Sequence, residues 1–343
     1  MADRPLQALF APAAGPAIGG GHLMRDLALA QALEAYGLSC TFATPPWGER
    51  LLQRFAVSPP SIHPLARSGE PKAIAAVLGA LAPDLLVLDD YSLAAADIAP
   101  LMHPGLRIAV IDDLANRDYA CDLLVDPGYG RCGGDYVGRA PSTCEVLTGP
   151  SYALLRPEFE RLETPAPDAG PVRRAFVSFG LSDVGAIAAR AVEALRPRAP
   201  HVRFDVALAS DAESLPRLQA LAAADPGLVV HPDSRGVAAL MRAADVAVGA
   251  GGSATWERCA LGLPTLAVIV ADNQRPMVHG MAEAGVLLGI EMAGVDFDGR
   301  LARAFDRLCR PEVRASLHIA ARSVCDGRGA SRVAEALLRL IRC

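Results

Sequence analysis

The chain has 343 residues, which is more than one hydrophobic core usually serves, so two domains of roughly 150 residues each are expected. The formal net charge of -5 and the lack of a Lys/Arg run argue against a nucleic-acid-binding surface. The start of the chain lacks signal-peptide features and no stretch reaches transmembrane length, so a cytoplasmic protein without membrane contacts is expected.

Short apolar runs alternate with amphipathic segments of helical length, which predicts βαβ units and parallel sheets. The fold class predicted is therefore α/β, with two doubly wound, Rossmann-like domains. The stretch from His22 to Tyr36 is predicted to be a helix, because its apolar residues recur at helical spacing. Strands predicted in the first half are Leu6 to Pro12, Ser39 to Ala43, Asp84 to Leu88, Arg107 to Ile111 and Cys121 to Val125.

An irregular segment rich in Pro and Ala, Glu163 to Pro171, is predicted to link the domains, which then span 1–160 and 172–327. The final segment, about 328–343, contains a Leu/Ala/Arg helix from Ala330 to Ile341 that is expected to pack back on the first domain. Strands predicted in the second half are Arg174 to Phe179, Phe204 to Ala209, Gly227 to His231, Val246 to Gly249 and Thr265 to Val270.

The first candidate for a catalytic or binding loop follows the first strand. It reads Ile18-Gly19-Gly20-Gly21-His22-Leu23-Met24-Arg25. Parallel sheets place ligand sites where such loops leave the carboxyl ends of strands. Glycines let the backbone approach a ligand, and the amino end of the helix offers free N–H groups and a positive dipole end. That dipole disfavours the imidazolium form of His22 and favours the neutral ring of a general base. The alternative is a tight turn with a surface histidine.

Two adjacent acids, Asp112 and Asp113, follow another buried strand in the run Asp112-Asp113-Leu114-Ala115-Asn116-Arg117. Neighbouring residues at the end of a strand point to opposite faces, which argues against a shared metal ion. At least one of the two is expected to cap a backbone segment or to form a salt bridge. The eight cysteines have neither CxxC nor zinc-like spacing, so they are expected to be reduced thiols and no metal is predicted.

Two glycine loops of the second half are candidates for a phosphate cradle. The loop from Gly249 to Arg258 includes Gly251, Gly252 and Ser253 and feeds a helix, so a diphosphate is expected on its N–H groups. The loop Ser178-Phe179-Gly180-Leu181-Ser182-Asp183 completes the cradle through Gly180 and Ser182, or Ser182 or Asp183 simply caps the next helix.

Polar side chains near these loops suit the rest of a sugar nucleotide. Glu257, one turn into the helix, is placed to accept hydrogen bonds from ribose hydroxyls; the alternative is a solvated Glu paired with an Arg. Asn273 and Gln274, in the run Ala271-Asp272-Asn273-Gln274 after a buried strand, suit sugar hydroxyls or acetamido groups.

Five stretches together resemble the UDP-sugar hydrolases of bacterial pseudaminic acid biosynthesis, which act on UDP-2,4-diacetamido-2,4,6-trideoxy-β-L-altrose. That family is similar in architecture to the GT-B glycosyltransferases, with two Rossmann-like domains facing across a cleft. The matching stretches are Gly21 to Arg25, Asp112 to Arg117 with Cys121 to Leu124, Gly149 to Pro157, Gly249 to Gly262, and Ala271 to Gln274.

The resemblance implies hydrolysis at the anomeric carbon with inversion, giving UDP and the free trideoxy sugar for flagellin or surface-glycan modification. It implies no metal and no cofactor, with a small UDP-sugar as the ligand and a monomer favoured. His22 matches the catalytic histidine of the family, and the Gly249 to Gly262 segment matches its UDP-binding stretch. The matches to the sugar side are Gly21, Arg25, Tyr91, Asn273 and Gln274.

The chain departs from the family pattern at Gly180-Leu181-Ser182-Asp183, and Asp26 stands where a Cys is common. The exact sugar is therefore less fixed than the UDP. Three alternatives to a hydrolase remain open: a GT-B glycosyltransferase that uses a UDP-sugar donor, a UDP-sugar 2-epimerase, and a non-catalytic sugar-nucleotide binding protein. The last is disfavoured by the presence of His22.

Overall fold

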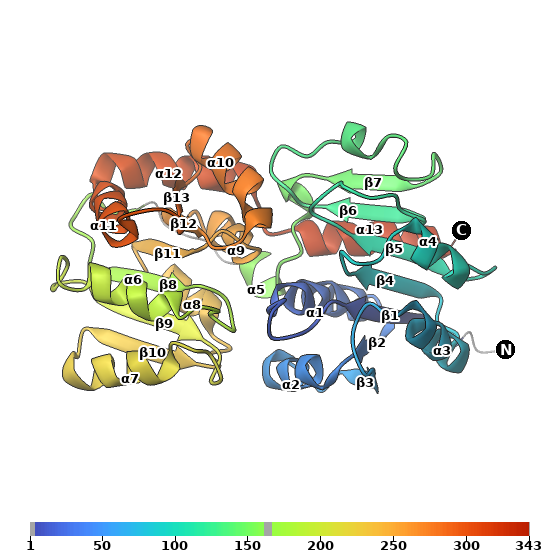
Figure 1. The fold of residues 1–343 in the computed structure, drawn as a ribbon. Helices are drawn as coiled ribbons and strands as arrows, with labels where there is room; N and C mark the ends of the chain where they lie inside the picture. The colour runs from blue at the N-terminus through green and yellow to red at the C-terminus, as the bar shows by residue number, and fades with distance from the viewer. Residues whose placement is uncertain (1–3, 161–166, 343) are drawn as a thin grey trace. The chain divides into compact units, whose positions relative to one another are not determined.

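The computed structural model describes residues 4–160 and 167–342. They form two compact units, described separately below: unit 1 comprises 4–157 with 327–342, and unit 2 comprises the described part of 158–326. Each unit is a fully parallel sheet with helices on both faces, as predicted (Figure 1). Of the predicted linker, residues 163–166 lie outside the described residues. No described helix has the length and apolar character that a membrane crossing requires.

Unit 1 has seven strands in the order β3-β2-β1-β4-β5-β6-β7. Alternate strand residues point to opposite faces, so Leu9 and Leu86 pack in one core while Phe10 stacks on Phe42 in the other. Because both faces are buried, the inner strands are continuous apolar runs, which is why the sequence predicts them well. The strands are β1 (Gln7–Pro12), β2 (Ser39–Thr44), β3 (Ser61–Pro64), β4 (Leu85–Asp89), β5 (Arg107–Ile111), β6 (Leu123–Asp126) and β7 (Glu145–Thr148).

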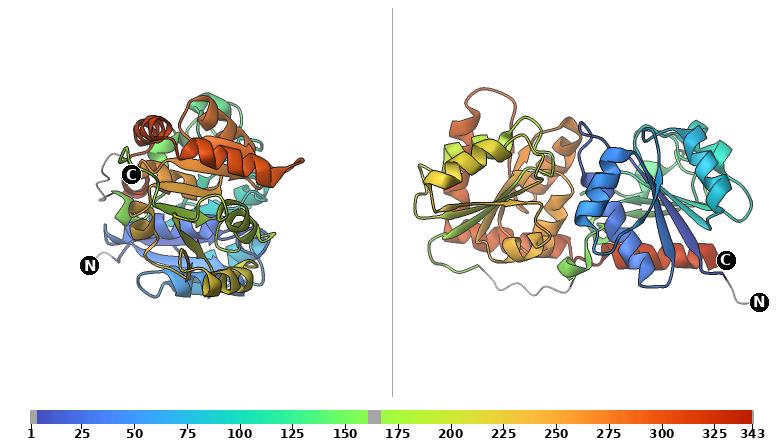
Figure 2. Two further views of the ribbon diagram at one scale, coloured as in Figure 1. Left: turned by 90° about the vertical axis from the view of Figure 1, so that its left-hand side faces the viewer. Right: turned by 90° about the horizontal axis from the view of Figure 1, so that it is seen from below.

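The last helix, α13 (Gly329–Arg342), belongs to unit 1, where it packs against α1, β5 and the turn η3 (Figure 2, red helix). Its Val333 and Leu337 are buried on one face, while Arg339 lies on the exposed side. Gly329 allows the close approach, because a Cβ there would lie 2.2 Å from the Ala153 carbonyl oxygen. The other helices of unit 1 are α1 (Gly21–Glu34), α2 (Pro46–Phe55), α3 (Pro71–Leu81), α4 (Ala95–Ile98), η1 (Ala99–Leu101), η2 (Gly133–Tyr136) and η3 (Pro150–Tyr152). The short helix α5 (Pro157–Glu160) starts at the last residue of the 4–157 stretch and continues into unit 2.

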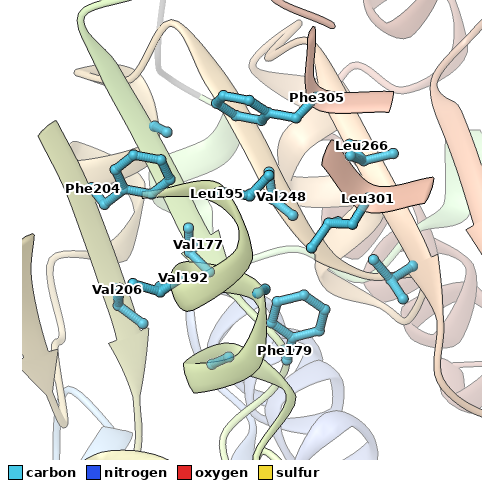
Figure 3. Close-up of a cluster of buried hydrophobic side chains, with 14 of the residues drawn as sticks. Val177, Phe179, Val192, Leu195, Phe204, Val206, Val248, Leu266, Leu301 and Phe305 are labelled. Carbon is cyan, nitrogen blue, oxygen red and sulfur yellow. The ribbon is translucent and has the colours of Figure 1, made fainter. Parts of the chain in front are cut away.

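Unit 2 has six strands in the order β10-β9-β8-β11-β12-β13. In one of its cores, Phe204 of β9 stacks on Phe305 of α11, with Val177 and Val248 of the sheet nearby (Figure 3). The elements are β8 (Arg174–Ser178), α6 (Ile187–Leu195), β9 (Arg203–Leu208), α7 (Leu215–Ala224), β10 (Leu228–Pro232), α8 (Val237–Arg242), β11 (Val246–Ala250), α9 (Ala254–Ala260), β12 (Thr265–Ile269), η4 (Asp272–Gln274), α10 (Arg275–Glu283), β13 (Leu288–Glu291), α11 (Phe297–Leu308) and α12 (Pro311–Val324).

Three strands of the structure have no predicted counterpart: β3, β7 and β13. All three are four residues long and lie at the edge of a sheet. Their side chains are partly exposed, so they lack the apolar run on which the sequence prediction depends. The inner strands match their predicted ranges to within one or two residues.

Candidate active site

The polar residues of unit 1 gather where its strand order reverses. Strand β1 is paired with β2 on one side and with β4 on the other, so chain connections leave this point in opposite directions. Such a switch point opens a crevice at the carboxyl ends of the two strands in doubly wound sheets. His22 lies in the first turn of α1, which follows β1, and Asp89 is the last residue of β4.

His22 and Asp89 form a close pair, with 2.6 Å between the His22 Nδ1 and the Asp89 Oδ1 atoms. Burial opposes ionisation of Asp89, but Arg25 and His22 outweigh it and hold the pKa of this carboxyl well below its usual value. Asp89 is therefore an acceptor, and Nδ1 of His22 carries the hydrogen. In the neutral ring this leaves the lone pair on Nε2, the atom that a general base needs.

Arg25 is buried three residues after His22 and joins two carboxylates. Its Nε and Nη2 atoms each donate to Asp89 over 2.6 Å, and Nη1 donates to Asp113 over 2.7 Å. Burial alone would lower the pKa of Arg25, but Asp113 and Asp89 raise it well above its usual value. The predicted contact of Arg25 with a sugar stays a prediction. Its bonds to protein carboxylates fit a positioning role instead.

Tyr91 completes this group two residues after Asp89. Its ring edge meets the His22 ring with 4.7 Å between the centroids, and its hydroxyl donates to Asp113. Burial raises the pKa of the Tyr91 hydroxyl, so it stays a donor. The structure thus brings together four residues that the sequence analysis had singled out: His22, Arg25, Tyr91 and Asp113. Gly21, the first residue of α1, adjoins them.

Asp112 lies in a second buried network and does what the sequence predicted for at least one of the two acids. Its carboxylate accepts the backbone N–H groups of Leu114 and Ala115 and forms a salt bridge with Arg117 over 2.6 Å. The hydroxyl groups of Tyr119 and Tyr136 also contact it. Both carboxylate oxygens of Asp112 are therefore engaged within the protein.

Asp126, at the end of β6, shares the Tyr136 hydroxyl with Asp112, at 2.6 and 2.9 Å respectively. One hydroxyl proton cannot serve two carboxylates at once, and burial raises the pKa of Asp126 to about 6. Within 4–160 and 167–342, no three His, Cys, Asp or Glu side chains are arranged to hold a metal ion.

The glycine loops of unit 2 also meet at a switch point, because β8 is paired with β9 on one side and β11 on the other. Gly180 has a φ of 94°, which favours glycine, and Ser182 is half-buried. The N-cap residue of α6 is Ala186, so neither Ser182 nor Asp183 is the N-cap that the sequence predicted. Asp183 is buried and still bonds to the start of this helix, because its carboxylate accepts the N–H of Ala188 in the first turn. Burial raises the pKa of Asp183 to about 6.

Between β11 and α9, Gly251 is buried, Gly252 is half-buried and Ser253 is exposed. A Cβ on Gly251 would lie 2.3 Å from the Val278 side chain, so this position needs glycine. A Cβ on Gly252 would meet only the Gln274 Nε2 atom at 3.7 Å, so side-chain packing does not require glycine here. Glycine at position 252 also leaves room for an anion to approach the backbone N–H groups, which is a reason for glycine other than packing.

Arg258 lies fully buried beneath this loop, where its Nη2 donates to the Ala250 carbonyl oxygen over 2.7 Å and to Thr255 over 2.9 Å. Its Nε and Nη1 atoms have no hydrogen-bond partner among the described residues. Burial lowers the pKa of Arg258 to about 10, so the side chain is still a cation at neutral pH. The loop therefore lies over a positive charge to which no carboxylate of the described residues is bonded.

The remaining predicted contacts lie near the same edge. Glu257 is half-buried in α9, and Asn273 is exposed in η4. The Gln274 Oε1 atom accepts the N–H of Val270 over 3.1 Å, so this oxygen holds the end of β12 in place. The roles predicted for these residues in binding UDP or sugar stay predictions.

Sequence reasoning missed Asp89 and Arg258. Asp89 ends a buried apolar strand, as Asp112 follows one, so the rule that found Asp112 also applies to it. Arg258 gave no signal, because a cation one residue after Glu257 is typical of an exposed helix.

Comparison with known proteins supports the resemblance on which the sequence analysis drew. No family model matches the chain. It is 24% identical to the UDP-2,4-diacetamido-2,4,6-trideoxy-beta-L-altropyranose hydrolase of Campylobacter jejuni over 290 residues, 82% of this chain and 97% of the relative. It is also 24% identical to the spore coat polysaccharide biosynthesis protein SpsG of Bacillus subtilis over 196 residues, 56% of this chain and 58% of that protein.

Solved structures show that the fold is of the GT-B type. MurG of Acinetobacter baumannii aligns over 98% of this chain and 100% of its own, with a TM-score of 0.66 and 16% identity. The spinosyn rhamnosyltransferase SpnG aligns over 99% and 100%, with a TM-score of 0.67 and 16% identity. A putative UDP-N-acetylglucosamine 2-epimerase from Listeria monocytogenes aligns over 99% and 97%, with a TM-score of 0.64 and 15% identity. These identities are too low to carry an activity across.

Proposed function

We propose that the chain is a UDP-sugar hydrolase. Its reaction releases UDP and 2,4-diacetamido-2,4,6-trideoxy-L-altrose by attack of water at the anomeric carbon with inversion, as a step of pseudaminic acid biosynthesis in the cytoplasm. The observation that carries the proposal is the 2.6 Å contact between His22 Nδ1 and the buried carboxylate of Asp89. The sequence similarity to a hydrolase with this substrate in its name supports it over most of the chain.

In the proposed reaction His22 acts as general base. Nε2 takes a proton from water while the water oxygen bonds to the anomeric carbon and the bond from that carbon to the UDP oxygen breaks. Asp89 keeps the ring oriented through Nδ1 and stabilises the imidazolium that forms, as the carboxylate of a catalytic triad does. UDP leaves as an anion, so protonation of the leaving group is not required. Attack opposite to the leaving group inverts the configuration.

Unit 2 is proposed to hold the UDP. The N–H groups near Gly252 and Ser253, together with Gly180 and Ser182, would contact the diphosphate, and Glu257 the ribose. The buried cation of Arg258 supports this assignment, because it stabilises negative charge above the loop. Asn273 and Gln274 are proposed for the sugar.

A GT-B glycosyltransferase is the second candidate, since MurG and SpnG share the fold. A transferase needs an acceptor, whereas a hydrolase needs only water. The test is to incubate the purified protein with the UDP-diacetamido-trideoxy-altrose and no acceptor, and to follow UDP by chromatography and the sugar by NMR.

UDP release at enzymatic turnover, with the free sugar of inverted anomeric configuration, is the expected result. Release of UDP only after an acceptor is added would overturn the proposal in favour of a transferase. Inversion at C2 of the sugar would point to an epimerase instead.

A further inference from the structure

Asp26, in the same helix as His22, is an ionisable residue that the proposed reaction does not use. Its side chain has 0% exposure, and neither carboxyl oxygen has a hydrogen-bond donor among the described residues. An ionised carboxylate in such a place has lost its hydration and gains no hydrogen bond in return, which costs roughly several kcal/mol of free energy. Burial therefore favours the protonated form of Asp26.

The acidic side chain that contacts Asp26 is that of Asp89 on β4, the partner of His22. Two ionised carboxylates are both acceptors, so they cannot bond to each other unless one holds a proton. Asp89 already accepts N–H groups from His22 and twice from Arg25. Those donors fix the charge on Asp89 and leave the proton to Asp26.

We propose that Asp26 and Asp89 form a carboxylic acid–carboxylate pair in which Asp26 keeps the proton and donates its O–H to Asp89. Asp26 is then a positioning residue behind the general base. By donating to Asp89 it disperses part of the negative charge that would otherwise hold a proton on His22. The kinetic consequence rests on the proposed function, but the shared proton does not.

The surrounding charges agree with this arrangement. Burial raises the pKa of Asp26 well above its usual value, the neighbouring Asp89 raises it further, and only Arg25 acts in the opposite direction. The charged groups that face Asp26 are thus Asp89 on β4 and Arg25 on its own helix, with His22 beyond Asp89.

Two variants of nearly the same shape separate the possible states of Asp26. Asp26→Asn stays neutral and keeps an N–H donor toward Asp89, whereas Asp26→Leu removes the donor. Loss of the donor leaves more charge on Asp89 and stabilises the imidazolium. We expect the titration midpoint of His22, followed by NMR of the ring carbons, to move up by roughly half a pH unit to one unit in Asp26→Leu and to stay in place in Asp26→Asn.

The other outcomes overturn the proposal. If Asp26 were ionised, both variants would remove a negative charge and both midpoints would move down. If neither midpoint moves, Asp26 is not coupled to Asp89. Asp183→Asn, which removes a buried carboxyl of unit 2, is the matched control and should leave the midpoint of His22 unchanged. Should Asp26→Leu fail to fold, Asp26→Ala replaces it.

The NMR experiment needs no turnover, so it can succeed even if the hydrolase proposal fails. In an active enzyme the acid limb of the pH profile of kcat/KM should move with the NMR midpoint, up in Asp26→Leu and not in Asp26→Asn. A fall in kcat with an unmoved limb would indicate a merely structural role for Asp26.

Discussion

The two sheets differ in the residues at the carboxyl ends of their strands, which are called the edge of unit 1 and the edge of unit 2 below. In unit 1 the carboxyl ends of β1, β4, β5 and β6 carry charged and aromatic side chains that are bonded to one another. Asp89 and Arg25 are buried there, and His22 is largely buried. In unit 2 the corresponding edge is made of glycines and small polar residues, with Ser253 and Asn273 exposed. Both units have the same type of topology, a parallel sheet with one switch point in its strand order.

The difference fits the proposed functions of the two units, catalysis in unit 1 and nucleotide binding in unit 2. Proton transfer needs groups whose position and charge are fixed before the substrate arrives, and a buried network supplies that. Binding of a nucleotide needs accessible backbone and room for phosphate, which glycines supply. The same fold thus offers one edge suited to chemistry and one suited to binding.

The largest effect is expected from His22→Asn, which tests whether the edge of unit 1 carries the chemistry. Loss of the general base should lower kcat by about 10²- to 10⁴-fold, while the Kd for UDP stays nearly the same. The rate is measured by UDP release without acceptor, and the affinity by calorimetry. His103→Asn, on the surface of unit 1, is the control. A near-normal rate for His22→Asn would remove this residue from the mechanism.

The Asp89→Asn variant tests whether the ionised carboxylate of Asp89 holds His22 and Arg25 in place. An amide cannot accept from both His22 and Arg25 as the carboxylate does, so a buried donor loses its partner. We expect the free energy of unfolding in urea to fall by about 3 kcal/mol, with a loss of activity from the misplaced ring. Asp84→Asn, at the other end of β4, should cost less. Equal losses in the free energy of unfolding for Asp89→Asn and Asp84→Asn would show that the contacts of Asp89 with His22 and Arg25 do not stabilise the fold more than those of Asp84.

For unit 2 the sharpest variant is Gly252→Ala. The added methyl group meets only the end of Gln274, so the melting temperature should change little. If phosphate approaches the backbone here, the methyl group blocks it, and KM should rise about tenfold, equivalent to about 1.4 kcal/mol. Gly79→Ala, inside helix α3 with open space around it, is the control. Unchanged KM in Gly252→Ala would remove this loop from the UDP site.

The last prediction is a pH dependence of the free energy of unfolding that comes from Asp26. Its pKa is higher in the folded than in the unfolded chain, so above about pH 4 the folded protein holds a proton that the unfolded chain has lost. The stability of the wild type relative to Asp26→Asn should therefore fall by about 1.4 kcal/mol for each unit of rising pH. Urea unfolding of both proteins between pH 5 and about 8 measures the slope. No pH dependence of this difference would mean that Asp26 is ionised in the folded chain, because the folded and unfolded states would then both lack the proton over this range.

Much of the fold follows from the sequence, because strands buried on both faces are continuous apolar runs. The edge strands β3, β7 and β13 escaped prediction, since their partly exposed residues give no such run. The loops of the candidate site were also found, because glycine and a following helix are local features.

Partners were harder to predict than positions. The pairing of His22 with Asp89 joins residues 67 positions apart and depends on the order of β1 and β4 in the sheet. The buried state of Arg25 and Asp26 is likewise a property of packing, because the helix pattern alone does not tell which polar residues face the sheet. Sequence therefore predicted where these residues lie in the fold better than which side chains they contact.

The most direct test of the account is hydrolysis in water labelled with a heavy oxygen isotope. Attack at the anomeric carbon, with His22 as base, predicts that one labelled oxygen appears in the released sugar and none in UDP by mass spectrometry. Label in UDP would mean attack at phosphorus, and it would contradict the mechanism proposed for this site.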